Sequence, residues 1–198
     1  MQIEKMVPSL AAALQPYAWR DDANSIKAKG CHACYEYYYS YARILQPAVV
    51  VEIGVQRGYS AISMIIGHPG IKQMHLFDND ADGYQLDTAL QQIRQACRHY
   101  QSGTKLACHK LDTQEIFSLP VNGMIDFAHI DGQHTYAGCS HDLELVACLV
   151  RPGGWLVVDD LWIPEVCRAA QEFAKANADW SHSLVPAHTT HQLSVKPN

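Results

Sequence analysis

Acidic residues end or follow short apolar segments at five places along the chain. Each segment has the length of a strand, and the segments at 49–53 and 155–158 are rich in valine or isoleucine. A single acid after a strand is commonly the N-cap of the next helix. Five in succession indicate a ligand site, because the ligands of an open parallel sheet bind outside the carboxyl ends of its strands. The acids are Glu52, Asp78, Asp112, Asp131 and the pair Asp159–Asp160.

The turn after the first apolar segment indicates the kind of ligand. The stretch "VVVEIGVQRGYS" contains Gly54 and Gly58, which permit a tight turn and a close approach of the backbone to a ligand. Their spacing matches neither the dinucleotide pattern GxGxxG nor a P-loop, so we do not expect a phosphate cradle. Asp78 is placed to accept hydrogen bonds from ribose hydroxyls, as the equivalent acid does in dinucleotide folds. These features favour a nucleoside-bearing ligand without phosphates.

The elements that must position these acids alternate between strands and helices, which indicates a parallel α/β sheet. We predict an α/β fold, a Rossmann-like doubly wound sheet of about seven strands, mostly parallel with a C-terminal antiparallel hairpin, and helices on both faces. The predicted strands are 49–53, 74–77, 105–111, 124–130 and 155–158, followed by a hairpin within 180–197. The predicted helices are 59–66, 84–100, 139–149 and 164–176, with "RPGG" as the turn that ends the third.

The chain is expected to form a single domain over residues 1–198. Within it, residues 1–47 form a helical N-terminal extension and residues 48–198 form a cofactor-binding α/β core. The predicted edge strands at the C-terminus could pair between subunits, so a homo-oligomer is possible.

Composition narrows the classes of partner and the compartment. The net charge of −5, from 20 acids against 15 bases, argues against a nucleic-acid partner. We find no apolar run long enough to cross a bilayer and no secretory signal, and therefore expect no membrane partner. Seven scattered cysteines, an odd number, indicate reduced thiols in a cytoplasmic protein. Cys31 and Cys34 form a CxxC that lacks a second ligand pair, which favours packing cysteines over a zinc or redox site.

Five segments resemble, in order, the motifs of one enzyme superfamily. "EIGVQRGYS" resembles motif I of class I S-adenosylmethionine-dependent methyltransferases. "HLFDND" and "KLDTQEI" resemble the ribose-binding and adenine-flanking segments, and "AHIDGQHTY" and "RPGGWLVVDDL" resemble two metal-binding segments. The set is similar to the metal-dependent small-molecule O-methyltransferases of the catechol O-methyltransferase type, and to their relatives that methylate sugar hydroxyls in natural-product pathways. The resemblance covers about residues 27–161.

The resemblance implies where S-adenosylmethionine binds. Glu52 and the turn at Gly54 and Gly58 would hold the methionine part of the cofactor. Ser60 would bond its carboxylate, helped by the free N–H groups at the start of the helix. An ordinary helix serine is the alternative for Ser60. The remaining cofactor residues are Asp78 at the ribose, and Asp112 and Thr113 beside the adenine, although Asp112 could instead cap a short helix.

The resemblance also implies a divalent cation. Asp131, Asp159 and Asp160 would bind Mg²⁺ or another divalent ion, since hard cations prefer oxygen ligands. Asp131 would lie beside the cofactor as well as the metal. The catechol branch has an Asp-Asn pair where this chain has Asp159–Asp160, so metal choice or affinity could differ. The alternative for Asp160 is a solvent-facing acid beside a single true ligand.

His134 is the candidate general base, with Asp131 beside it as a catalytic residue. It falls where the catechol branch carries a lysine base, and the sugar-modifying relatives have a histidine in this region. An imidazole with a pKa near 6.5 suits the removal of a hydroxyl proton. The alternative is a loop histidine that packs or caps, and we interpret His129 as structural.

The acceptor implied by a metal that chelates two oxygens is a vicinal diol, of a sugar or of a catechol-like natural product. Trp162 is a candidate for contacting it. The tyrosines at 35 and 37–39 fit an amphipathic helix packing on the sheet better than aromatic walls around the acceptor. Two other readings stay open: a metal-independent small-molecule methyltransferase, and a non-catalytic S-adenosylmethionine-binding subunit. The missing GxGxxG argues against a nicotinamide-dependent oxidoreductase.

Overall fold

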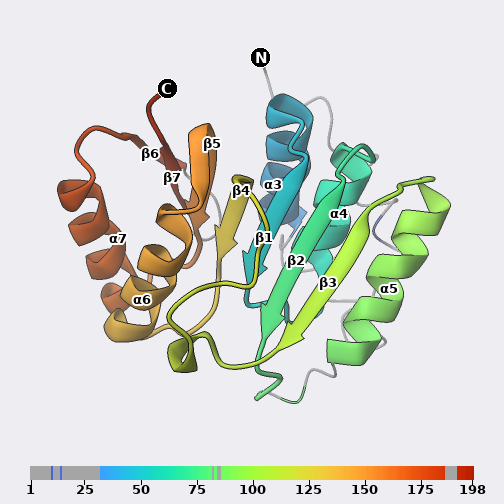
Figure 1. Ribbon diagram of the computed structural model, residues 1–198, viewed down its shortest axis with the longest axis horizontal. Coiled ribbons are helices and arrows are strands. Elements are labelled where there is room, and N and C mark those ends of the chain that lie inside the picture. Colours follow the sequence, from blue (N-terminus) through green and yellow to red (C-terminus); the bar gives the residue numbers. More distant parts are fainter. Residues whose placement is uncertain (1–9, 11–13, 15–31, 82, 84–85, 186–190) are drawn as a thin grey trace.

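The computed structural model of the chain describes residues 10, 14, 32–81, 83, 86–185 and 191–198. Seven strands form one sheet in the order β3-β2-β1-β4-β5-β7-β6 (Figure 1). The strands β1 to β5 are parallel to one another, whereas β7 is antiparallel to both β5 and β6. The strands are β1 Val49–Ile53, β2 Gln73–Asp78, β3 Lys105–Lys110, β4 Ile125–Ile130, β5 Val150–Val158, β6 Ser181–Val185 and β7 His191–Val195.

Helices cover both faces of this sheet, so the predicted doubly wound fold is confirmed. One face carries α3, α4 and α5, and the other carries α6 and α7 (Figure 1). A short 3₁₀ helix, η3, follows β3. The bounds are α3 His32–Leu45, α4 Tyr59–Gly67, α5 Leu86–His99, η3 Thr113–Glu115, α6 Tyr136–Ala147 and α7 Pro164–Ala176.

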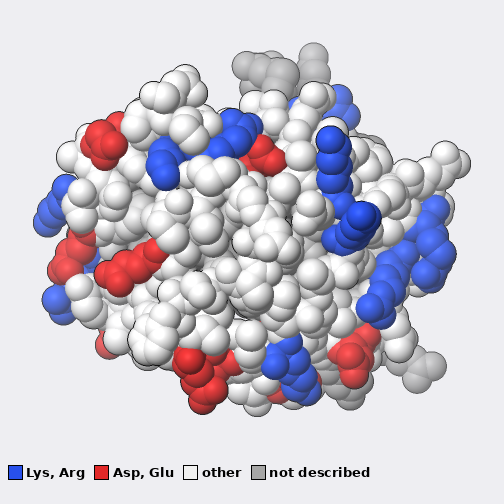
Figure 2. Space-filling view, viewed as in Figure 1, with Lys and Arg blue, Asp and Glu red and all other residues white. Residues whose placement is uncertain are grey.

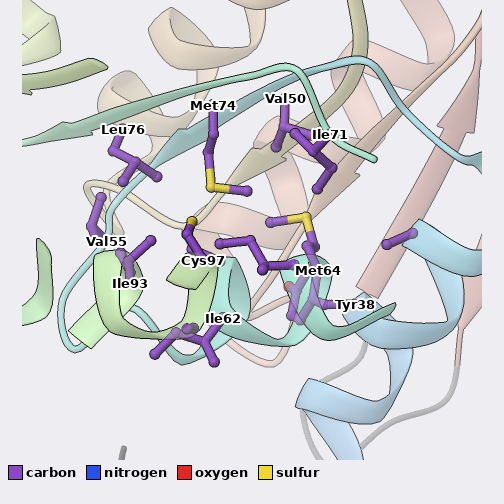
Figure 3. Packing of buried hydrophobic residues seen from close by; sticks show 14 of the residues in the cluster. Tyr38, Val50, Val55, Ile62, Met64, Ile71, Met74, Leu76, Ile93 and Cys97 are labelled. Carbon is purple, nitrogen blue, oxygen red and sulfur yellow. The ribbon is translucent and has the colours of Figure 1, made fainter. Parts of the chain in front are cut away.

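The apolar side chains of the strands alternate between two cores, as the period of two of a β-strand requires. On β1, Val50 belongs to the core under α4 and α5, whereas Val51 and Ile53 belong to the core under α6 and α7. Figure 3 shows the first core, in which strand side chains point toward the buried faces of α4 and α5. The labelled strand residues are Val50, Met74 and Leu76, and the labelled residues of α4 and α5 are Ile62, Met64, Ile93 and Cys97.

The prediction that "RPGG" is a turn is wrong. Residues 151–154 lie within β5, which begins at Val150, and the pairing of β5 with β4 shifts register between Ile125 and Phe127. Gly153 takes up the irregularity with a φ of 70°. The main chain of Lys196 explains why the strand continues: Gly153 N–H donates to its carbonyl, and its own N–H donates to the Gly154 carbonyl.

Parts of the N-terminal and C-terminal predictions lie outside the described residues. Leu10 and Leu14 are helical and buried, but the chain around them is not described. The predicted hairpin is confirmed as β6 and β7, without its loop. None of the described helices combines the length and the apolar character that a bilayer span requires. The five cysteines whose side chains are described are free thiols, and Cys31 and Cys34 lie outside that set.

Charged side chains of both signs lie around the rim of the face shown in Figure 2, and the middle of that face carries none. The uncharged middle of this face overlies the sheet (Figures 1 and 2).

The helix α3 packs against α4 through a close contact between backbones. A Cβ atom added at Gly67, the last residue of α4, would lie 2.4 Å from the carbonyl oxygen of Tyr39 in α3. Because the obstacle is backbone, a side chain at this position requires the two helices to separate. Gly67 therefore fixes how closely α3 packs against α4.

We predict that Gly67→Ala lowers the free energy of unfolding by about 1–3 kcal/mol, although alanine favours a helix, because overpacking separates α3 from α4. Urea unfolding of wild type and variant measures the change. The matched control is Gly103→Ala, where an added Cβ meets nothing within 4 Å. The free energy of unfolding of this control should be unchanged or raised by up to about 1 kcal/mol. A Gly67→Ala protein as stable as the control would contradict the contact.

Candidate active site

The predicted acids meet at one end of the sheet, where the parallel strands have their carboxyl ends. The strand order places β1 and β4 side by side, although β2 and β3 lie between them in sequence. This is the topological switch point, where open α/β sheets bind ligands. The strand ends are level there, since Ile53 pairs with both Phe77 and Ile130, and Ile130 pairs with Val158.

Two adjoining cavities open at this end of the sheet. The larger has a volume of about 480 Å³ and the smaller about 120 Å³, and both are lined by Gly54, Gln56 and Asp131. Of the predicted site residues, the larger is lined also by Asp78, Asp112, Thr113, His134 and Asp160, and the smaller by Gly58, Ser60 and Asp159. The exception is Glu52, which lines neither cavity and is completely buried beneath them.

Gly54, just after β1, lies close against the backbone of Asp131, just after β4. Its φ is 86°, and an added Cβ atom would lie 1.9 Å from the carbonyl oxygen of Asp131. The turn is held by two backbone bonds, from Gly54 N–H to the Phe77 carbonyl at 2.9 Å and from Asp131 N–H to the Ile53 carbonyl at 2.8 Å. Glycine is needed here for its conformation and for the space that a side chain would occupy.

Asp78 holds the same turn from the neighbouring strand. Its Oδ2 accepts hydrogen bonds from the backbone N–H groups of Val55 and Gln56, at 2.8 and 2.9 Å, and its Oδ1 accepts from Asp80 N–H at 2.6 Å. A carboxylate has about four lone-pair sites, so Asp78 keeps capacity for a ligand in the cavity that it lines. Sequence reasoning missed the bonds to the turn because they connect segments that are distant in sequence.

The far end of the larger cavity is formed by η3 and supported by α6. Asp112 caps η3 by accepting a hydrogen bond from Gln114 N–H at 3.0 Å. This capping role is the alternative, expected from the sequence, to a contact with the adenine. Thr113 is buried, and its hydroxyl donates to Asp142 Oδ1 at 2.6 Å. The Thr113 hydroxyl is thus directed at α6, and Asp142 is a supporting residue that the sequence analysis did not single out.

A chain of buried hydrogen bonds connects Glu52 to Asp159. Ser60 Oγ donates to Glu52 Oε1, and His129 Nδ1 lies 3.0 Å from the same oxygen. The hydroxyl of Tyr38, from α3, lies 2.7 Å from His129 Nε2 and donates to Asp159 Oδ2 at 2.9 Å. His129 is therefore bonded to protein groups on both sides, which agrees with a structural residue. The connection that it makes between Glu52 and the acid cluster was not foreseen.

The donors along this chain indicate that His129 is protonated on both nitrogens. The single hydroxyl proton of Tyr38 goes to Asp159, so Nε2 of His129 must donate to the Tyr38 oxygen. The Glu52 carboxylate can only accept, so Nδ1 donates as well. Burial lowers the pKa of His129, but the neighbouring carboxylates of Asp159 and Glu52 outweigh it and raise the pKa to about 10.

The acids Asp131, Asp159 and Asp160 fall into two overlapping groups of possible cation ligands. Ligand atoms of Asp131, His134 and Asp160 lie within 4.8 Å of one another, and so do those of His129, Asp131 and Asp159. Asp131 belongs to both groups. Both nitrogens of His129 already make hydrogen bonds, so the carboxylates remain as the possible metal ligands. Oxygen ligands of this kind suit Mg²⁺. Burial, together with the nearby Asp159 and Asp160, raises the pKa of Asp131 to about 6.

His134 lies at the mouth of the larger cavity, between two of these acids. Its Nε2 is 3.4 Å from Asp131 Oδ1 and 3.4 Å from Asp160 Oδ2, and its side chain is 46% exposed. The hydrogen bond to Asp131 raises the pKa of His134 above its ordinary value. The histidine can thus hold a proton where it faces both the acids and the cavity.

Asp160 has a strained backbone and contacts Trp162. Its φ of 56° is in the left-handed region, which non-glycine residues rarely adopt and which is often found at functional sites. Trp162 Nε1 donates to Asp160 Oδ1 at 2.9 Å, while its ring is 66% exposed. Asp160 is thus not a freely rotating surface acid, since Trp162 and His134 both restrict it.

Comparison with known families and structures places this geometry in context. A family model described as a methyltransferase domain matches residues 51–161, which contain the strand ends and all the acids above. A comparison with curated protein sequences gave no match.

Three solved structures show the same fold at low sequence identity. An O-methyltransferase from Bacillus cereus in complex with SAH has a TM-score of 0.68 and 16% identity, covering 98% of this chain and 94% of that one. The O-methyltransferase NovP has a TM-score of 0.68 and 16% identity, and the match covers 99% of this chain and 98% of NovP. TomG from Streptomyces achromogenes, an O-methyltransferase of tomaymycin synthesis in complex with SAM, has a TM-score of 0.64 and 16% identity, covering 98% and 90%.

We predict that Asp142 makes the stability of the protein depend on pH. Asp142 is fully buried, its Oδ2 has no hydrogen-bond partner among the described residues, and burial raises its pKa to about 6. An acid with a raised folded-state pKa contributes stability that is complete below its unfolded pKa of about 3.9 and is lost as the pH rises through about 6.

Asp142→Asn keeps an oxygen that accepts from Thr113 and removes the titration. Relative to wild type, the variant should therefore gain about 1–3 kcal/mol of unfolding free energy between about pH 4 and pH 7. Urea unfolding of both proteins across this range measures the gain. A stability difference that stays constant with pH would show that Asp142 does not titrate there.

Proposed function

Because the chain belongs to the methyltransferase-domain family, we propose that it is an S-adenosylmethionine-dependent O-methyltransferase that acts on a small-molecule hydroxyl. The observation that carries the proposal is the pair of adjoining cavities at the switch point, lined by the strand-end acids and meeting at Gly54 and Asp131. The presence of SAM or SAH in two of the structurally similar O-methyltransferases supports this cofactor.

In this proposal the cofactor spans both cavities. The larger cavity takes the nucleoside, with Asp78 accepting from the ribose hydroxyls and the backbone around Asp112 and Thr113 beside the adenine. The smaller cavity takes the methionine part, at the free N–H groups of the first turn of α4 and beside Ser60. Glu52 does not contact the cofactor in this proposal. It is buried beneath the smaller cavity, where it holds Ser60 and His129 by hydrogen bonds.

The acceptor hydroxyl approaches from the side of Asp131 and His134. A divalent cation such as Mg²⁺, held by Asp131, Asp159 and Asp160, would favour the deprotonated form of that hydroxyl. The carboxylate oxygens suit such an ion because they are hard donors, and an oxygen of Asp159 and one of Asp160 each lie within 4.8 Å of an Asp131 oxygen. An acceptor with two neighbouring oxygens, a vicinal diol of a sugar or catechol type, suits a cation site with this many protein oxygens.

The chemical step is an in-line displacement at the methyl carbon. The acceptor oxygen forms a bond to that carbon, the carbon–sulfur bond breaks, and its electron pair stays on sulfur to give neutral S-adenosylhomocysteine. His134 takes the hydroxyl proton on Nδ1, because Nε2 donates to the Asp131 carboxylate. Asp131 and Asp160 stabilise the resulting imidazolium, which follows from their distances of 3.4 Å. The protein's main contribution is to hold the two substrates in line.

We predict that S-adenosylhomocysteine binds the wild-type protein in calorimetry, and that Mg²⁺ added to this complex gives a second heat that EDTA abolishes. Asp131→Asn should lose the Mg²⁺ heat, because it removes a charge from the acid cluster without changing the size of the side chain. The matched control is Glu144→Gln, an exposed acid on α6, which should leave both heats unchanged.

The outcomes of this experiment separate the alternatives. Failure of S-adenosylhomocysteine to bind would overturn the proposed function. Cofactor binding and methyl transfer without any effect of Mg²⁺ would identify a metal-independent methyltransferase. Cofactor binding with no transfer to any catechol or sugar diol would favour a non-catalytic subunit.

We predict that His134→Gln lowers kcat for methyl transfer by about 10²–10⁴-fold, the usual contribution of a general base. The dissociation constant of S-adenosylhomocysteine should not change, because the cofactor contacts proposed above do not include His134. His99→Gln, at an exposed position near the end of α5, is the control and should keep full activity. Unchanged kcat in His134→Gln would remove His134 from the role of base.

A further inference from the structure

The tyrosine at position 38 of α3 reaches the acid cluster from outside the segment that the family model matches. That model begins at residue 51, whereas Tyr38 contacts partners 91 and 121 residues away in sequence. We propose that Tyr38 is a positioning residue that fixes the carboxylate of Asp159 for binding the divalent cation. This inference rests on the proposed function, and it adds a residue from α3 to the proposed site.

The Tyr38 hydroxyl holds one oxygen of Asp159, and the backbone holds the other. Tyr38 donates to Oδ2 at 2.9 Å, and Asp160 N–H donates to Oδ1 at 2.7 Å. The two bonds, one on each oxygen, fix the plane of the carboxylate. Hydrogen bonds of this kind to a metal-binding carboxylate orient it, and their loss typically costs 10–100-fold in metal affinity.

The position of Tyr38 is itself fixed. Its side chain is 1% exposed, its ring lies 4.4 Å from that of His129 between centroids, and its oxygen is 2.7 Å from His129 Nε2. His129 is held in turn by Glu52 at 3.0 Å. Rotation of the Tyr38 hydroxyl away from Asp159 would thus break a buried network.

Tyr41 shows what a tyrosine used only for packing looks like on the same helix. It is 6% exposed, and its ring packs against Phe127 and Trp155. Its hydroxyl has no hydrogen-bond partner among the described residues. The two tyrosines therefore provide a matched pair, in which removing the hydroxyl breaks a described hydrogen bond to the acid cluster at one position and none at the other.

The experiment is calorimetric titration of Mg²⁺ into the S-adenosylhomocysteine complexes of wild type, Tyr38→Phe and Tyr41→Phe. We expect Tyr38→Phe to weaken Mg²⁺ binding by about 10–100-fold, with unchanged affinity for S-adenosylhomocysteine. Tyr41→Phe should match wild type in its affinity for Mg²⁺ and in its affinity for S-adenosylhomocysteine. Equal Mg²⁺ affinity in the two variants would overturn the role of Tyr38 and leave the proposed function intact.

Two further outcomes would be interpreted differently. A wild type that binds S-adenosylhomocysteine but no Mg²⁺ would overturn the metal dependence and the role of Tyr38 together. If Tyr38→Phe does not fold, NMR of the wild type decides. Slow solvent exchange of the Tyr38 hydroxyl proton, slower still with Mg²⁺ bound, would support the proposal, and rapid exchange would overturn it.

Discussion

The architecture of the site depends on how closely the ends of β1 and β4 approach each other. The backbone of Gly54 lies against the carbonyl of Asp131 at a distance that excludes even a methyl group. The two strands are separated in sequence by two others, and their contact brings the turn after β1 against the loop that carries Asp131 and His134. The two cavities adjoin at this contact, where the proposed cofactor would cross from one to the other.

A second layer of buried polar groups supports this contact from below. Glu52, His129 and Tyr38 do not offer free atoms to the larger cavity, but they are bonded to Ser60 and Asp159, which line the smaller one. Charges without solvent are expensive unless each is paired. The His129 imidazolium between the Glu52 and Asp159 carboxylates meets that requirement, and it explains why an acid can stand in the middle of an otherwise apolar strand.

The sequence predicted the features that local pattern determines. The strand 49–53, the parallel core, the C-terminal hairpin and the gathering of acids at one end of the sheet all follow from periodicity and from the rule for open sheets. What it missed depends on contacts between distant segments. "RPGG" has the composition of a turn, yet pairing with the main chain of Lys196 keeps it in β5. Likewise, nothing local indicates that Tyr38 reaches Asp159, that Asp142 holds Thr113, or that Glu52 is closed off from the cavities.

The contact of Tyr38 with Asp159 also bears on where the functional unit ends. The module matched by the family model spans residues 51–161, whereas α3 contributes a side chain to the acid cluster and β7 pairs with the C-terminal half of β5. A chimera that exchanged only the module between two such proteins would inherit the acids without the tyrosine that bonds them. The functional unit of this chain therefore extends beyond the module at both of its ends.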